Sequence, residues 1–195
     1  VPAESRAQLD ALAAKLDRVG RAYLDEGLTF GYHNHHVEFM PVEGITPYDY
    51  LMSNTDPALV KIELDIGWLA YAGVDPVAYL RRHAGRVVSC HLKDYDPTVA
   101  TDVPQRKLVA PGAGTIDFAA VLQAMRETGV GHGFIEVDVS DDPLADIRRG
   151  RDHLAAGFFA LAAFLGAAGH GLVVRMLFTG GCAAIADRGA GLADA

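Results

Sequence analysis

The feature that most constrains the fold is a repeated unit in which a short apolar strand leads into a loop and then a helix. The strands are expected at residues 28–35, 59–66, 86–92 and 133–138, and the first begins apolar and ends in polar residues. Four such units in series require a parallel sheet with helical crossovers, either doubly wound or part of a closed barrel. The predicted fold class is therefore α/β.

Helices are expected between these strands because apolar residues recur there at helical spacing. Residues 4–26 form an amphipathic pattern that ends before a glycine. Three further helices begin at an aspartate suited to cap a helix or at a proline suited to the first turn. These helices are expected to start at Asp75, Asp117 and Pro143.

The units fill residues 1–154, whereas residues 155–195 are an Ala/Gly-rich extension in which 172–178 is a weaker candidate strand. An eight-stranded barrel typically takes about 250 residues, so four units correspond to half of one. The chain begins with Val1 rather than Met and no signal peptide is apparent, so we expect a missing start and a cytoplasmic location.

Composition excludes several classes of partner. The formal net charge is −8 and the basic residues are scattered, so nucleic acid is not an expected partner. Residues 154–169 carry no charge but are mostly Ala and Gly, so no membrane span is expected. Cys90 and Cys182 lack the spacing of a metal or redox motif.

One residue that can bind a divalent cation stands near the end of each expected strand: His33, Asp65, His91 and Glu136. The carboxyl ends of parallel strands open on one face, so these side chains should converge. Any one of them alone is more often a hydrogen-bonded or helix-capping residue, but four at matching positions favour a site. Two imidazoles and two carboxylates suit Mn²⁺, Co²⁺, Zn²⁺ or Fe²⁺.

Strand alternation also groups neighbours of these residues. Because residues two apart share a face, Glu63 is expected beside Asp65, and Ser89 beside His91. The spacing alone leaves open which face is inward.

Five segments together resemble the xylose-isomerase-like TIM-barrel superfamily, which contains sugar phosphate isomerases/epimerases and relatives of inosose dehydratase. In the expected order they are Gly31–Phe39, Glu63–Trp68, Cys90–Asp94, Gly112–Phe118 and Phe134–Asp138. The resemblance covers about residues 5–154. It implies a partial (β/α)₈ TIM barrel, namely the C-terminal half with strands five to eight.

By this resemblance, Asp65, His91 and Glu136 fall on metal-ligand positions of strands six to eight. The epimerases have a glutamate as fourth ligand on strand five, and His33 stands at that position here. Glu38, just past the strand, could supply the missing carboxylate, although a solvated loop glutamate is an equal alternative.

The chemistry implied is proton transfer next to a carbonyl that a divalent ion (Mn²⁺, Co²⁺, Zn²⁺ or Mg²⁺) polarises, with an enediolate intermediate. Glu136 or Glu38 would act as base, and His35 or Lys93 would protonate or hold the substrate oxygen. Substrate contacts are expected from three residues, with a core position as the alternative for the tryptophan: Asn34, Trp68 and Lys93.

The leading hypothesis is a metal-dependent isomerase or epimerase of a small sugar or polyol. The alternative on the same site is a dehydratase or lyase of a keto-inositol or 3-keto-glycoside, which His33 favours. A DNA-repair endonuclease of the superfamily is a third reading, and the acidic charge argues against it. Because a half barrel exposes sheet edges, an inactive fragment and a homo-oligomer of halves are further expectations.

Overall fold

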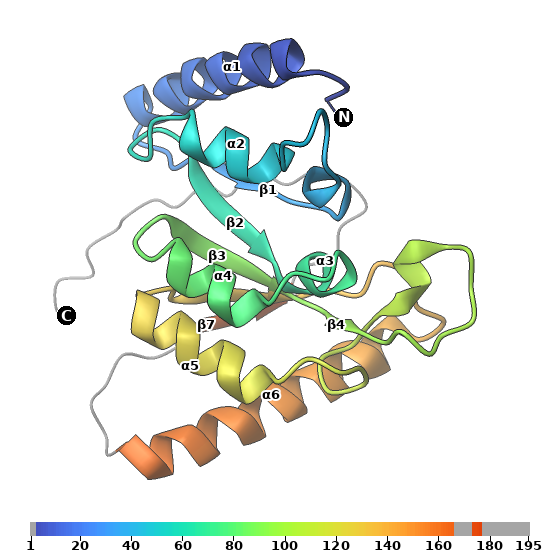
Figure 1. Ribbon diagram of the computed structural model, residues 1–195. Helices are drawn as coiled ribbons and strands as arrows, with labels where there is room; N and C mark the ends of the chain where they lie inside the picture. The colour runs from blue at the N-terminus through green and yellow to red at the C-terminus, as the bar shows by residue number, and fades with distance from the viewer. Residues whose placement is uncertain (1–2, 166–172, 177–195) are drawn as a thin grey trace, which may run out of the picture.

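The computed structural model describes residues 3–165 and 173–176, and its centre is a five-stranded parallel sheet (Figure 1). Its strands lie in the order β1-β2-β3-β6-β7. The bounds are Gly31–His33 for β1, Lys61–Asp65 for β2, Val87–Leu92 for β3, His132–Ile135 for β6 and Val173–Met176 for β7. Each strand pairs in parallel with the preceding one, as the predicted units require.

The strand order decides between the two predicted architectures. A doubly wound sheet reverses its strand order at a switch point. Here the order follows the chain in one direction throughout, as in a barrel wall. The prediction of an α/β fold with part of a TIM barrel is therefore confirmed, and we keep the barrel winding rather than the doubly wound alternative.

Six α-helices are described, and local signals set several of their starts. The helices are α1 (Arg6–Asp25), α2 (Pro47–Ser53), α3 (Ile66–Tyr71), α4 (Pro76–Arg82), α5 (Phe118–Thr128) and α6 (Pro143–Leu165). The side chains of Ser5, Asp75 and Asp117 each accept a backbone N–H in the first turn of the helix that follows. Figure 1 shows α4, α5 and α6 packed in series, and α1 on α2.

The core forms between these helices and one face of the sheet. Alternate strand residues are completely buried there: Ile62, Leu64, Cys90 and Leu92. Because strand side chains alternate, the residues between them point to the other face. These are the polar side chains Glu63, Asp65, Ser89 and His91, so the predicted pairs share a face.

The structure differs from prediction in several elements. The first strand spans 31–33 rather than 28–35, because the chain turns after His33 into a 3₁₀ helix, η1 (Val37–Phe39). The loop before α5 contains η2 (Pro104–Lys107) and a small antiparallel pair, β4 (Asp94–Tyr95) with β5 (Leu108–Val109). Helices α2 and α3 were not predicted.

The C-terminal region is described in part. Helix α6 continues to Leu165, across the predicted boundary at 154, and residues 173–176 form β7 inside the predicted strand 172–178. The rest of the 155–195 extension lies outside the described residues, so the domain division stays a prediction. Among the described helices, none is long and apolar enough to cross a membrane.

Candidate metal centre

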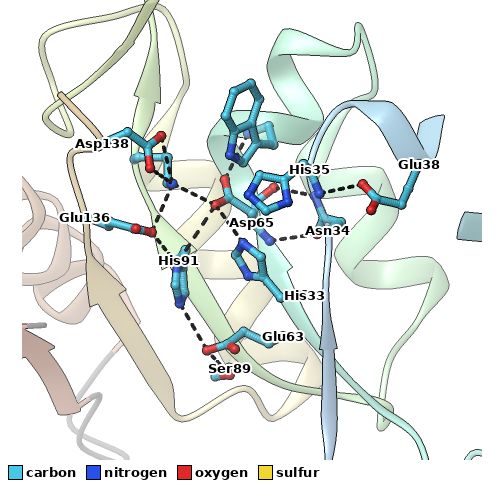
Figure 2. Close-up of polar contacts among 12 residues, drawn as sticks. His33, Asn34, His35, Glu38, Glu63, Asp65, Ser89, His91, Glu136 and Asp138 are labelled. Atoms are coloured by element: carbon cyan, nitrogen blue, oxygen red, sulfur yellow. Dashed lines mark hydrogen bonds and ion pairs between the residues drawn. The ribbon is translucent and has the colours of Figure 1, made fainter. Parts of the chain in front are cut away.

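Three of the predicted ligands come together where β1, β2 and β3 end. The donor atoms of His33, Asp65 and His91 all lie within 4.8 Å of one another. Asp65 Oδ2 is 3.6 Å from His33 Nε2 and 4.0 Å from His91 Nδ1. Figure 2 shows the two imidazoles directed toward the Asp65 carboxylate.

Asp65 holds this place because its two oxygens have different partners. Its Oδ1 accepts the backbone N–H of Trp68 at 2.9 Å and so caps α3, which begins directly after β2. Its Oδ2 is left for the cluster. The side chain is completely buried, and the capping bond fixes its orientation.

Glu136 and Lys93 complete the cluster on the β3–β6 side. Glu136 follows β6, and its Oε2 contacts His91 Nδ1 and lies 2.9 Å from Lys93 Nζ. Lys93 Nζ also lies 3.1 Å from Asp65 Oδ2 and 3.0 Å from Asp138 Oδ1. The Lys93 side chain is only 1% exposed, so three carboxylates surround a buried ammonium.

These contacts determine the charge states. For His91, burial opposes protonation, but hydrogen bonds to Glu136 and Glu63 and the charge of Asp65 raise its pKa to about 10. For Glu136, burial opposes ionisation, but the His91 hydrogen bond and the Lys93 charge lower its pKa to about 2. Burial raises the pKa of Asp65 above its ordinary value despite the nearby Lys93.

The β1 side of the cluster is neutral. Burial, with His91 and His35 nearby, lowers the pKa of His33 to about 3. His33 Nδ1 is buried without a hydrogen-bond partner among the described residues. His35 is exposed, and its ring packs edge-on against His33 with 5.1 Å between centroids.

The residues fit a divalent cation on three grounds. Donors about 2.1 Å from one ion are at most about 4.2 Å apart, and both separations to Asp65 Oδ2, 3.6 and 4.0 Å, meet this limit. The imidazole and carboxylate donors suit a borderline or hard ion. Finally, Asp65 Oδ2 is buried without a hydrogen-bond partner among the described residues, which leaves this oxygen available to a cation.

Two predicted substrate residues are placed elsewhere. Asn34 is completely buried, and its amide joins β1 to β2 by accepting the Asp65 N–H at 2.9 Å and donating to the Asp65 carbonyl at 3.3 Å. Trp68 is 2% exposed and stacks under His36. In this geometry Asn34 binds the backbone of Asp65, and Trp68 lies at the core position expected as its alternative.

Glu38 does not take the place of the missing strand-five glutamate. Its Oε2 accepts the backbone N–H of His35 at 2.8 Å, and Tyr32 donates to its Oε1 at 3.5 Å. Figure 2 shows the Glu38 carboxylate at the backbone N–H of His35, apart from the Asp65 carboxylate. Glu38 thus stabilises the loop after β1, and the geometry argues against its predicted role as a base.

The sequence analysis gave no role to two carboxylates that touch the cluster. Glu63 Oε1 lies 3.1 Å from His91 Nε2, and Asp138 accepts hydrogen bonds from Lys93. Each of the two lies two positions from a predicted ligand, Asp65 or Glu136, and strand residues two apart share a face. That signal marks a shared face but does not identify the partner.

Asp94 is a further buried residue that the prediction missed. Its carboxylate accepts four backbone N–H groups at 2.8–3.0 Å, from Tyr95, Gly112, Gly114 and Ile116. A side chain at position 114 would collide with this carboxylate, so the glycine there is required by close approach. Asp94 therefore ties the end of β3, next to Lys93, to the loop before α5.

Comparison with known proteins agrees with this architecture. A family model described as "Xylose isomerase-like TIM barrel" matches residues 1–157. The inosose dehydratase of Clostridium beijerinckii is 34% identical over 143 residues, which cover 68% of this chain and 47% of that protein. The chain thus spans about half the length of the curated relatives that it matches.

Solved structures share the fold at lower identity. A sugar phosphate isomerase/epimerase from Parabacteroides distasonis aligns with a TM-score of 0.64 at 24% identity, covering 78% of this chain and 55% of that one. An L-ribulose 3-epimerase aligns with a TM-score of 0.61 at 16% identity, covering 87% and 62%. At these identities the likeness concerns the fold alone.

Proposed function

The chain belongs to the xylose isomerase-like TIM-barrel family, and on this basis we propose that it acts as a divalent-metal-dependent enzyme that removes water from a keto-polyol. The observation that carries the proposal is the asymmetry of the cluster. Carboxylates and an ammonium lie on the β3–β6 side, whereas the β1 side presents imidazoles. Elimination needs a base and a different acid, which such an arrangement offers.

The metal ligands in this proposal are His33, Asp65, His91 and Glu136. A divalent ion held there would polarise the carbonyl of a bound keto-polyol and acidify the neighbouring C–H. The ion could be Mn²⁺, Co²⁺, Zn²⁺ or Mg²⁺, since the donors are nitrogen and oxygen.

The protein's own groups would then move the protons. Glu136 is ionised at neutral pH and would accept the proton from carbon. The Lys93 ammonium, fixed among carboxylates, would stabilise through its charge the substrate oxygen that gains negative charge. His35 is exposed across the cluster from Glu136 and would protonate the departing hydroxyl, which leaves as water (Figure 2).

Similarity supports the choice of substrate class. Relatives at 34% and 32% identity are named inosose dehydratases, so a keto-inositol is the first substrate to test. Isomerisation or epimerisation is the second candidate. It is favoured by the same His35, which could return a proton to the face opposite Glu136.

The test is incubation of the purified chain, with and without added Mn²⁺ or Co²⁺, with a keto-inositol in D₂O, followed by NMR. Loss of water to give a dehydrated product supports the proposal. An isomer that carries solvent deuterium favours the second candidate instead. A chain that neither binds metal nor turns over substrate would contradict both, and a size measurement on that sample would distinguish an inactive fragment from an assembly of halves.

A further inference from the structure

A buried carboxylate lies behind His91, on the side away from the other proposed ligands. Glu63 and Ser89 are register partners on β2 and β3, one layer below the pair Asp65 and His91. Glu63 Oε1 lies 3.1 Å from His91 Nε2 and accepts a hydrogen bond from Ser89 Oγ at 3.3 Å. Figure 2 shows this layer below the imidazole.

The His91 ring is therefore held between two carboxylates, one at each nitrogen. Its Nδ1 contacts Glu136 and faces Asp65, whereas its Nε2 faces Glu63. An imidazole that binds a metal through one nitrogen keeps its proton on the other, and the partner of that proton fixes the ring. Here Glu63 is the partner of Nε2.

We infer that Glu63 is a positioning residue that keeps the proton of His91 on Nε2 and so presents Nδ1 to the metal. The inference rests on the proposed metal site. It goes beyond that site because it assigns the ligating nitrogen and the residue that selects it. Ser89 contributes by holding the Glu63 oxygen in place.

Glu63 acts behind the ligand and is not itself a ligand in this arrangement. Glu63 Oε1 meets His91 at Nε2, which is the ring nitrogen opposite the one that faces Asp65 and Glu136. Glu63 is 8% exposed, and Figure 2 shows its carboxylate below the His91 ring, whereas Asp65 lies above it. A carboxylate behind a ligating histidine typically changes metal affinity about 10–100-fold when it is removed.

The test measures Zn²⁺ affinity, by competition with a chromophoric chelator, and the His91 ring nitrogens, by long-range ¹H–¹⁵N NMR of ¹⁵N-histidine-labelled chain. The His91→Gln variant assigns the His91 signals. In the wild type with Zn²⁺, we expect Nε2 to be protonated and Nδ1 to carry the shift of a metal-bound nitrogen. Glu63→Leu should weaken Zn²⁺ binding about 10-fold or more and remove the preference for Nε2–H.

Two milder variants keep the test decisive. Glu63→Gln retains an oxygen that can accept from Nε2–H and should preserve the nitrogen assignment with a smaller loss of affinity. Glu63→Asp keeps the charge but is too short to reach Nε2, so it should behave like Glu63→Leu even if the leucine variant fails to fold.

The outcomes separate this inference from the proposed function. If folded Glu63→Leu or Glu63→Asp binds Zn²⁺ within twofold of the wild type, with Nδ1 still the ligand, the inference is overturned while the metal site stands. If the wild-type chain itself binds no Zn²⁺, Mn²⁺ or Co²⁺, the proposed function fails, and this inference fails with it.

Discussion

On the β3–β6 side of the candidate site the polar groups are charged, buried and bound to one another, whereas on the β1 side they are neutral or exposed. Lys93 is surrounded by carboxylates, and His91 lies between two of them. Across the cluster, His33 has a buried nitrogen without a partner among the described residues, and His35 is exposed on the loop after a three-residue strand.

The difference separates two tasks. Charged groups that already hold one another need little rearrangement during a reaction, so the β3–β6 side is suited to stabilise developing charge. The β1 side has unsatisfied or exposed imidazoles, which suits it to accept a metal and a substrate. If this division holds, substitutions on the β3–β6 side should lower both stability and turnover, whereas those on the β1 side should chiefly lower turnover.

The largest effect on stability is expected from Lys93→Met. Methionine has a similar length but no charge, so Asp65, Glu136 and Asp138 would lose their shared cation. Removing one partner of a buried ion pair typically costs about 3–5 kcal/mol. Urea unfolding measures the loss. Lys15→Met, at an exposed position on α1, is the control, and its unfolding free energy should stay within about 0.5 kcal/mol of the wild-type value. Equal unfolding free energies for the Lys93 and Lys15 variants would mean that Lys93 does not stabilise the β3–β6 side.

Asp94→Asn should have the next largest effect. The asparagine matches the aspartate in shape, but its NH₂ group would face two of the four backbone N–H groups that the carboxylate accepts. We expect a loss of about 2 kcal/mol, together with faster hydrogen exchange at residues 112–116, because charged hydrogen bonds are lost. Asp96→Asn is the matched control, since that carboxylate accepts its hydrogen bonds from the backbone N–H and hydroxyl of Thr98, two residues away. Unchanged exchange in the Asp94 variant would contradict the role assigned to it.

The pH dependence of stability in the chelator-treated protein tests the comparison in another way. Glu63, Asp65, Glu136 and His33 all face His91, and their balance raises its pKa from 6.5 to about 10. A pKa that is higher in the folded than in the unfolded chain stabilises the protein. This stabilisation is complete below the unfolded-state pKa and is lost as the pH rises from about 6.5 toward 10. Stability should therefore fall over this alkaline range.

The β1 side should give the opposite slope. His33, faced by His91, His35, Glu63 and Lys93, has its pKa lowered from 6.5 to about 3. The unfolded chain then binds a proton that the folded chain does not, so stability falls as the pH drops from about 6.5 toward 3. His91→Gln should flatten the alkaline slope and His33→Gln the acidic one, as followed by urea midpoints. Identical profiles for both variants would remove the contrast between the two sides.

The parts of the fold that the sequence predicted depend on local signals. Asp75 and Asp117 cap α4 and α5 through hydrogen bonds to residues two or three positions away, so the neighbouring sequence suffices. Helix α3 was missed because its cap, Asp65, was interpreted only as a ligand, although one carboxylate does both. The first strand was predicted too long because Asn34 leaves the sheet to bind the Asp65 backbone, a contact between distant segments.

The same distinction explains the site. The convergence of Asp65, His91 and Glu136 could be predicted because parallel strands end on one face. The direction of side chains beyond the strand ends could not be predicted, because each additional residue after the strand turns the chain. Trp68 and Glu38 therefore ended in packing and loop contacts.

The smallest effect on stability is expected from His35→Ala, and this variant tests the division most sharply. The exposed ring packs on His33 and Trp68, and its loss should change the unfolding free energy by no more than about 0.5 kcal/mol. Turnover should nevertheless fall about 100-fold or more if His35 protonates the leaving hydroxyl, because a positioned acid contributes at least that much. A His35→Gln variant controls for loss of the ring's bulk without restoring an acid. Stability lost with turnover intact would place His35 among the structural residues and would contradict the view that the β1 side is the reactive, loosely held one.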